Sequence, residues 1–190
     1  MRRETSWLIQ LQLKLFHRIH SRACINTTVN KIPAIALSSP LLIIMNVEIE
    51  IPDGLEFPIP EMEMREIIET LLKFLLNNNL GYFSLRLVDD KNIQEINLIS
   101  RGIHKPTDVL SFPSPQIPSP FQSIGEVIIS YDTLFTQARE IGHSPKDEFL
   151  RLLVHGVLHL LGYDHETSKQ DEKKMQAKED ECLDLLYSIT

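Results

Sequence analysis

Three of the chain's seven histidines lie within eleven residues, in the stretch HGVLHLLGYDH from His155 to His165. His155 and His159 are four residues apart, so on a helix their side chains lie on one face, about one turn from each other. Gly162 can adopt the left-handed conformation that ends a helix, and His165 follows three residues later. This spacing predicts a helix, a reversal of the chain, and three imidazoles around one point.

Three neutral imidazole nitrogens can bind one zinc ion and leave a fourth tetrahedral position open, which is typical of a catalytic site rather than a structural one. His155, His159 and His165 are therefore the predicted metal ligands, with one Zn²⁺ per chain. A lone histidine is more often a surface or core residue, and we interpret the other histidines of the chain in that way.

The same spacing occurs in the long zinc motif of metzincin peptidases, which carry a glutamate directly after the first histidine. That glutamate is the general base of peptide hydrolysis. The corresponding residue here is Gly156, which has no group that accepts a proton. Peptidase chemistry by that mechanism is therefore disfavoured.

Apolar residues that alternate with polar ones predict four short strands, at residues 46–51, 83–88, 108–112 and 125–130. Apolar residues at helical spacing predict helices at 61–78, 92–100, 132–142 and 145–161, and a last helix after Thr167. Ser144 is the predicted N-cap of the histidine helix, and Thr167 with Gln170 forms a predicted capping box. The order of elements indicates an α+β fold with a small mixed four-stranded sheet and surrounding helices.

Charge divides the chain at Met45. Residues 1–44 hold six basic residues and one acidic residue, a net charge of +5, whereas the whole chain carries −7, so residues 45–190 carry −12. The length fits one domain with a proper core, and we assign it to 45–190. We interpret 1–44 as an N-terminal extension of unclear role, either a targeting segment or residues upstream of a start at Met45.

An acidic domain does not attract nucleic acid through its overall charge, so an RNA or DNA partner requires a local basic patch. The two cysteines, Cys24 and Cys182, are far apart in sequence and fit a reducing compartment. No apolar run has the length of a membrane span. We therefore expect a cytoplasmic protein without a membrane partner, and the sequence leaves its oligomeric state open.

Four segments together resemble the YbeY family of rRNA maturation factors. LVHGVLHLLGYDH (153–165) resembles the family's signature, and INLISRGIHKPTDVLSFP (96–113) its arginine-bearing segment and following strand. IGEVIIS (124–130) is similar to the next strand, and HETSKQDEKKMQAKEDECLDLL (165–186) to its acidic closing helix. The resemblance covers about 46–187.

The resemblance implies an α+β fold with a zincin-like site, in which a zinc ion is held by residues that match His155, His159 and His165. It implies a metal-dependent, single-strand-specific endoribonuclease in rRNA processing, at the 3′ end of a 16S-type rRNA, and in ribosome quality control. Its partners would be rRNA and the ribosome or small subunit. The family's functional arginine matches Arg101, the predicted catalytic residue.

From the residues alone, Arg101 would by default be a solvated surface charge. Beside a metal ion its guanidinium becomes a bidentate phosphate clamp. His104 and Lys105 would add the local positive charge that an acidic protein needs to hold RNA. Thr107 and Asp108 either orient that segment or serve only as turn residues.

Three further features of the site stay open at this level. The attacking group is either a water activated by the metal or the 2′-hydroxyl of the RNA. Asp164 and Glu166 either orient an imidazole or belong to a charged loop and helix start. Gly156 either leaves room beside the ion for an RNA backbone or relieves packing against a neighbouring strand.

Two other functions remain as alternatives to the endoribonuclease. One is a zinc hydrolase of another class, such as a peptidase, against which Gly156 argues. The other is a non-catalytic ribosome-assembly factor whose zinc stabilises the fold.

Overall fold

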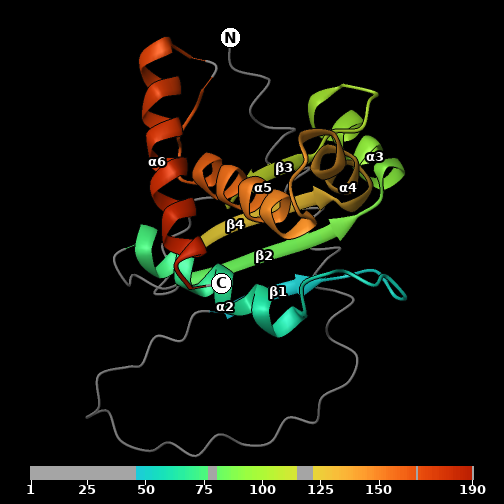
Figure 1. Cartoon of the computed structure of the whole chain (residues 1–190). Coiled ribbons are helices and arrows are strands. Elements are labelled where there is room, and N and C mark those ends of the chain that lie inside the picture. Colours follow the sequence, from blue (N-terminus) through green and yellow to red (C-terminus); the bar gives the residue numbers. More distant parts are fainter. Residues whose placement is uncertain (1–45, 77–80, 115–121, 166, 190) are drawn as a thin grey trace, which may run out of the picture. The chain divides into compact units, whose positions relative to one another are not determined.

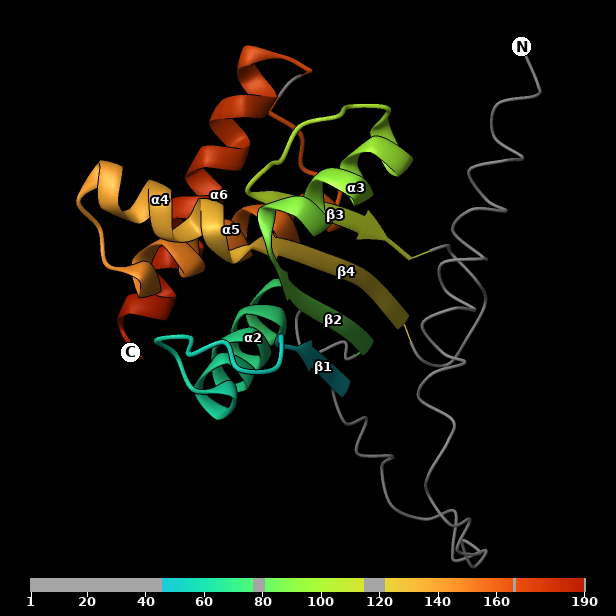
Figure 2. The ribbon, with the colours of Figure 1, turned by 90° about the vertical axis from the view of Figure 1, so that its right-hand side faces the viewer.

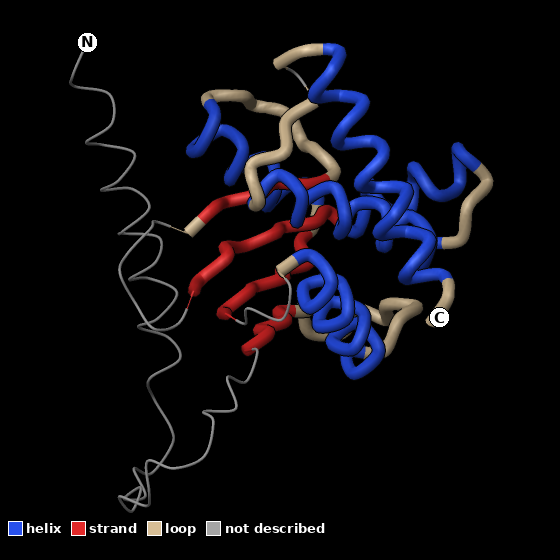
Figure 3. The backbone as a smooth tube through the Cα atoms, turned by 90° about the vertical axis from the view of Figure 1, so that its left-hand side faces the viewer, coloured by secondary structure: helices blue, strands red, loops and turns tan. Residues whose placement is uncertain are grey.

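Four strands form one mixed sheet in the computed structural model, which describes residues 46–76, 81–114, 122–165 and 167–189 (Figure 1). The strands are β1 (Asn46–Glu50), β2 (Gly81–Val88), β3 (Val109–Pro113) and β4 (Gln122–Ser130). Figure 3 shows the strands side by side, and their order in the sheet is β1-β2-β4-β3. The pairs β1–β2 and β2–β4 are parallel, and β3 runs antiparallel to β4. The predicted four-stranded mixed sheet is confirmed.

The predicted helices are present as well. They are α2 (Glu61–Leu75), α3 (Asp90–Arg101), α4 (Tyr131–Ile141), α5 (Pro145–Leu160) and α6 (Lys169–Tyr187). The histidine helix α5 begins as expected: the Ser144 hydroxyl accepts the Asp147 N–H, and the Asp147 carboxylate accepts the Ser144 N–H. This capping box satisfies backbone groups that the first turn of a helix leaves free.

The predicted start of α6 is wrong by one residue. The N-cap is Ser168, whose hydroxyl oxygen accepts the Asp171 N–H at 3.1 Å. The Thr167 hydroxyl instead donates to the Asp164 carboxylate at 2.6 Å. Two neighbouring hydroxyl residues can each cap a helix, and the preceding turn decides between them because it engages the first.

Strand alternation separates two apolar layers, one on each face of the sheet. In β4, Val127 and Ile129 join the main core, whereas Ile128 between them points to the opposite face. The main core lies between the sheet and four helices, α2, α4, α5 and α6, which Figure 2 shows gathered on one side of the strands. A smaller cluster joins Ile128 to Ile93 of α3 on the other face. The helices α3 and α5 therefore cover opposite faces of the sheet.

The position of α5 is fixed by two close approaches to the sheet. The Ser111 hydroxyl of β3 donates to the Gly156 carbonyl at 2.9 Å. In β4, Gly125 has a φ of +140°, at a point where the pairing with β2 shifts register. A Cβ there would collide with the Phe112 carbonyl and touch Leu160 at the end of α5, so only glycine fits.

All described residues belong to one compact unit, Leu42–Thr190. The extension predicted for residues 1–44 lies outside the described residues, as does most of the proline-rich segment between β3 and β4. Among the described helices, none combines the length and apolar character that crossing a membrane requires.

Candidate metal centre

The three histidines of the predicted metal site lie together at the end of α5 and in the turn after it. The ligand atoms of His155, His159 and His165 all lie within 4.8 Å of one another. The Nε2 atoms of His155 and His159 are 3.1 Å apart, so both rings direct the same nitrogen toward one point. The ring centroid of His165 lies 5.2 Å from each of the other two rings.

Backbone hydrogen bonds at the end of α5 explain how His165 reaches the two helical histidines. Gly162 has a φ of +87°, and its N–H donates to the His159 carbonyl at 3.1 Å. The Tyr163 N–H donates to the Leu158 carbonyl, also at 3.1 Å. This pair of bonds is the Schellman motif, which ends a helix and turns the chain back. The predicted role of Gly162 is confirmed.

A carboxylate from α6 holds one of the imidazoles. Glu179 Oε1 lies 2.7 Å from His155 Nδ1. When the carboxylate accepts the Nδ1–H, the other ring nitrogen, Nε2, keeps its lone pair and faces the neighbouring histidines. Partners of this kind fix the orientation of metal-binding imidazoles and raise their basicity. Sequence analysis missed Glu179, because it lies 24 residues away in a helix that contains many other carboxylates.

The surroundings of His159 favour its neutral form. Burial lowers the pKa of its imidazole, and the nearby His155 and His165 rings lower it further. A neutral imidazole has a free lone pair, which is the form that binds a metal ion.

Of the two acidic residues beside His165, the structure describes Asp164. The Asp164 carboxylate accepts the Thr167 hydroxyl, and its negative charge offsets a small part of the lowering of the His159 pKa. Glu166 lies outside the described residues.

Position 156 faces the sheet, not the histidines. A Cβ on Gly156 would lie 2.8 Å from Val127 Cγ1 and 3.2 Å from the Ser111 hydroxyl oxygen, and the residue is buried. The interpretation that Gly156 leaves room for RNA beside the ion is therefore wrong. The alternative, packing against a neighbouring strand, is confirmed. A glutamate at this position would point into the sheet and could not serve a metal site as a base.

Arg101 comes from a different helix than the histidines of α5. It is the last residue of α3, exposed, and followed by Gly102 with a φ of +73°. The loop after it, residues 102–107, carries the exposed His104 and Lys105 and leads to β3, the edge strand on which α5 packs. The Asp108 carboxylate accepts both the Val109 N–H and the Thr107 hydroxyl, which is turn chemistry.

The donor set fits a metal ion. Three imidazoles offer convergent nitrogens, one is kept neutral by burial, and one is oriented by a carboxylate. Such a set suits zinc and leaves room for a further ligand.

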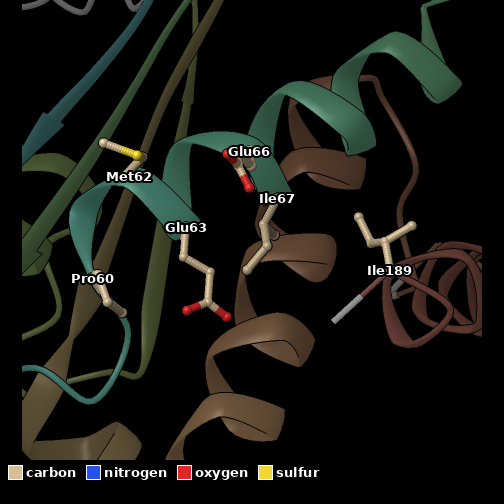
Figure 4. A pocket seen from close by; sticks show the side chains of 6 residues that line it. All are labelled: Pro60, Met62, Glu63, Glu66, Ile67 and Ile189. Atoms are coloured by element: carbon tan, nitrogen blue, oxygen red, sulfur yellow. The ribbon is translucent and has the colours of Figure 1, made fainter.

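A surface hollow at the start of α2 is a separate feature (Figure 4). Its lining comprises Pro60, Met62, Glu63, Glu66, Ile67 and Ile189. It contains none of the three histidines. Of its two carboxylates, Glu63 pairs with Lys146 of α5 at 2.7 Å.

Comparison with known proteins gives a consistent result. The family described as "Endoribonuclease YbeY" matches residues 53–187. A protein of that name from Leptospira interrogans is 50% identical over 131 residues, covering 60% of this chain and 93% of the relative. One from Aquifex aeolicus is 46% identical over 118 residues, covering 62% of this chain and 78% of the relative. The solution structure of TM1509 from Thermotoga maritima aligns with a TM-score of 0.50 at 25% identity, covering 76% of this chain and 90% of that one.

Proposed function

The chain belongs to the YbeY endoribonucleases, and from this premise we propose that it is a metal-dependent endoribonuclease that cleaves single-stranded RNA during rRNA processing. The observation that carries the proposal is the convergence of three imidazoles, one of which is hydrogen-bonded through its Nδ1 to the Glu179 carboxylate. The finer proposal is a cut at the 3′ end of a 16S-type rRNA, with a role in ribosome quality control and with the small subunit as partner.

In this proposal His155, His159 and His165 hold one Zn²⁺ per chain, and Glu179 keeps His155 in the tautomer that binds. Zinc supplies Lewis-acid chemistry to a phosphodiester. Burial and the two neighbouring imidazoles lower the pKa of His159, which favours the neutral form that binds a metal ion.

Arg101 is the proposed catalytic residue, acting as a clamp on a phosphate of the substrate. The proposal is supported by its exposure and by the exposed His104 and Lys105 that follow it, Lys105 being a further cation in an acidic domain. A guanidinium offers two parallel N–H donors to two phosphate oxygens, which fixes the orientation of the phosphate as well as its position.

Of the two alternatives, the peptidase is not favoured, because a general base at position 156 would lie inside the helix–sheet contact. The assembly factor with a structural zinc differs from the enzyme in one measurable respect, RNA cleavage. The cytoplasmic location stays a prediction.

The central experiment measures zinc content and RNA cleavage on one preparation, with and without a chelator. We expect cleavage of single-stranded RNA that the chelator abolishes and added zinc restores. Arg101→Ala should keep the fold and the zinc but lose about 2–4 kcal/mol of transition-state stabilisation, roughly 30- to 1000-fold in rate.

The matched control is Arg139→Ala. Arg139 is also exposed in the last turn of a helix that ends at a left-handed glycine, Gly142. Arg139→Ala therefore measures the effect of removing a favourable positive charge from a helix C-terminus, at a position that is not proposed to bind phosphate. Equal effects of the two substitutions would return Arg101 to an ordinary surface charge, and a metal-loaded protein that leaves RNA intact would favour the assembly factor.

We also propose that residues 45–190 form the catalytic domain and that 1–44 are an extension that it does not need. The match to the family lies within 45–190, at residues 53–187. A chain of residues 45–190 should have the melting temperature and zinc content of the whole chain. Aggregation or loss of metal in the shorter chain would refute this division.

A further inference from the structure

The helix α5 carries a polar stripe on an otherwise buried, apolar surface. Glu148, Arg151, His155 and His159 follow one another at spacings of three, four and four residues, so they lie on one face. Glu148 is 0% exposed, and it is the one charged side chain in the buried set of the described residues. The two histidines belong to the proposed metal site, but nothing in that site explains Glu148 and Arg151.

Arg151 compensates the buried carboxylate with a forked ion pair. Its Nε lies 3.1 Å from both oxygens of Glu148, and its Nη2 lies 2.6 Å from Oε1. These bonds raise the pKa of the guanidinium, so Arg151 remains a cation. An isolated buried carboxylate is costly, so this pair alone could account for the presence of an arginine.

The guanidinium also reaches beyond Glu148 to two other elements. Its Nη2 donates to the Gln137 Oε1 of α4 at 3.2 Å and lies 3.7 Å from the Asp108 Oδ2. The Gln137 amide in turn donates to the same Asp108 oxygen at 3.3 Å. Glu148, Arg151, Gln137 and Asp108 therefore form one network, called here the Arg151 network, which joins α5 and α4 to the residue that precedes β3.

The loop between α3 and β3, residues 102–107, is called here the cationic loop. The Arg151 network meets the end of this loop. Asp108 directly follows residues 102–107, and its other oxygen binds the Val109 N–H at 2.9 Å. The loop is also fastened to α3 by the Asn97 amide, which is 4% exposed and donates to the Lys105 carbonyl at 2.9 Å. The loop is thus held on one side to α3 and on the other to α5.

This second attachment matters because α3 and α5 lie on opposite faces of the sheet. Packing of one helix on the other does not set the distance between Arg101 and the histidines. Polar side chains that join the end of the loop directly to the histidine helix can set it. Arg151 also lies within electrostatic reach of Glu179, the carboxylate that holds His155.

We propose that Arg151 is a positioning residue: through Asp108 it fixes the cationic loop relative to the histidine helix, and so sets where a substrate phosphate lies relative to the metal. The inference rests on the proposed function. It assigns Arg151 no contact with RNA, because Glu148, Asp108 and Glu179 already surround its charge.

Asp108→Asn is the variant that tests this role without exposing a buried charge. It removes the carboxylate that Gln137 and Arg151 contact and leaves the Glu148–Arg151 pair intact. A second variant, Glu148→Gln combined with Arg151→Gln, removes both partners of the buried pair together, so neither is left as an unpaired buried charge. The control is Ser144→Ala, which removes the N-cap of α5 and lowers stability without touching the loop.

Three measurements are made on each variant: zinc affinity, melting temperature, and binding of the zinc-free protein to a fluorescent single-stranded RNA at several salt concentrations. For the wild type, the logarithm of the RNA-binding constant falls with the logarithm of salt concentration. The slope is about 0.7 for each phosphate that a protein cation contacts, so it reports the number of such contacts. Asp108→Asn and the double variant should lower this slope, weaken RNA binding about tenfold and leave zinc affinity within about twofold. Ser144→Ala should lower the melting temperature and leave the slope unchanged.

The deciding comparison is a double-mutant cycle. If Arg151 acts by positioning the loop, Arg101→Ala should cost several-fold less in RNA binding on the Asp108→Asn background than on the wild type. If the effects of Arg101→Ala and Asp108→Asn on RNA binding were additive, the inference would be overturned. The same holds if the salt slope of RNA binding fell together with the melting temperature in all variants, including Ser144→Ala. Failure of the inference is distinct from failure of the proposed function, in which the wild type itself would neither bind nor cleave RNA.

Discussion

Gly156→Glu is expected to prevent the chain from reaching its folded state. The new Cβ would lie 2.8 Å from Val127 Cγ1, and the carboxylate beyond it would be buried between α5 and the sheet. An unpaired buried carboxylate costs several kcal/mol and overpacking adds about 1–3 kcal/mol, together comparable with the 5–15 kcal/mol that stabilises a typical domain. Circular dichroism and thermal melting of the purified variant measure the outcome. A folded variant that keeps its zinc would contradict the packing role of Gly156.

A graded version of the same test separates size from charge. Gly156→Ala should lower stability by about 1–3 kcal/mol, although alanine favours a helix by about 1 kcal/mol over glycine. Val127→Ala removes the methyl groups that the new Cβ would meet, so the two substitutions together should cost less than the sum of each alone. If Gly156→Ala instead raised the melting temperature, the contact with Val127 would not constrain the helix.

His159→Ala should remove most of the metal affinity. A bound structural zinc contributes about 10–16 kcal/mol through four ligands, so losing one imidazole should weaken binding by roughly 3 kcal/mol, more than 100-fold. Competition with a chromogenic chelator measures the affinity. RNA cleavage should fall with the metal content, while the melting temperature of the metal-free protein changes by much less.

Two companion variants make this result specific. Glu179→Gln keeps all three imidazoles but weakens the hold on His155, and should lower metal affinity by about 10- to 100-fold. His104→Ala removes an exposed histidine outside the cluster and should leave metal affinity unchanged. Equal affinities for the wild type and His159→Ala would refute the proposed ligand set.

The features that sequence predicted well are those set by neighbouring residues. The capping box of Ser144 and Asp147 and the turn at Gly162 depend on contacts within a few positions, and both are present. Spacing alone placed His155 and His159 on one face. The start of α6 was misplaced because Ser168 and Thr167 are locally equivalent, and only the contact of Thr167 with Asp164 distinguishes them.

The features that sequence missed depend on which elements meet. The spacing of α5 fixes the angle between Gly156 and His155 around the helix, but not which of the two faces the sheet. Glu148 is an acidic residue in the first turn of α5, where solvent exposure is the usual state, yet it is fully buried against Arg151. Glu179 is one acid among many in α6 until the packing of α6 on α5 brings it to His155.

The dependence of His155 on α6 has a consequence for protein synthesis. A ribosome completes all of α5, with two of the three histidines, before it makes any residue of α6. The nascent histidine helix therefore lacks both the carboxylate that orients His155 and the apolar surface that covers it, including Met175 and Cys182. Under the function proposed here, the metal centre is therefore complete only after α6 has been made and has packed on α5, later than the histidine spacing alone would indicate.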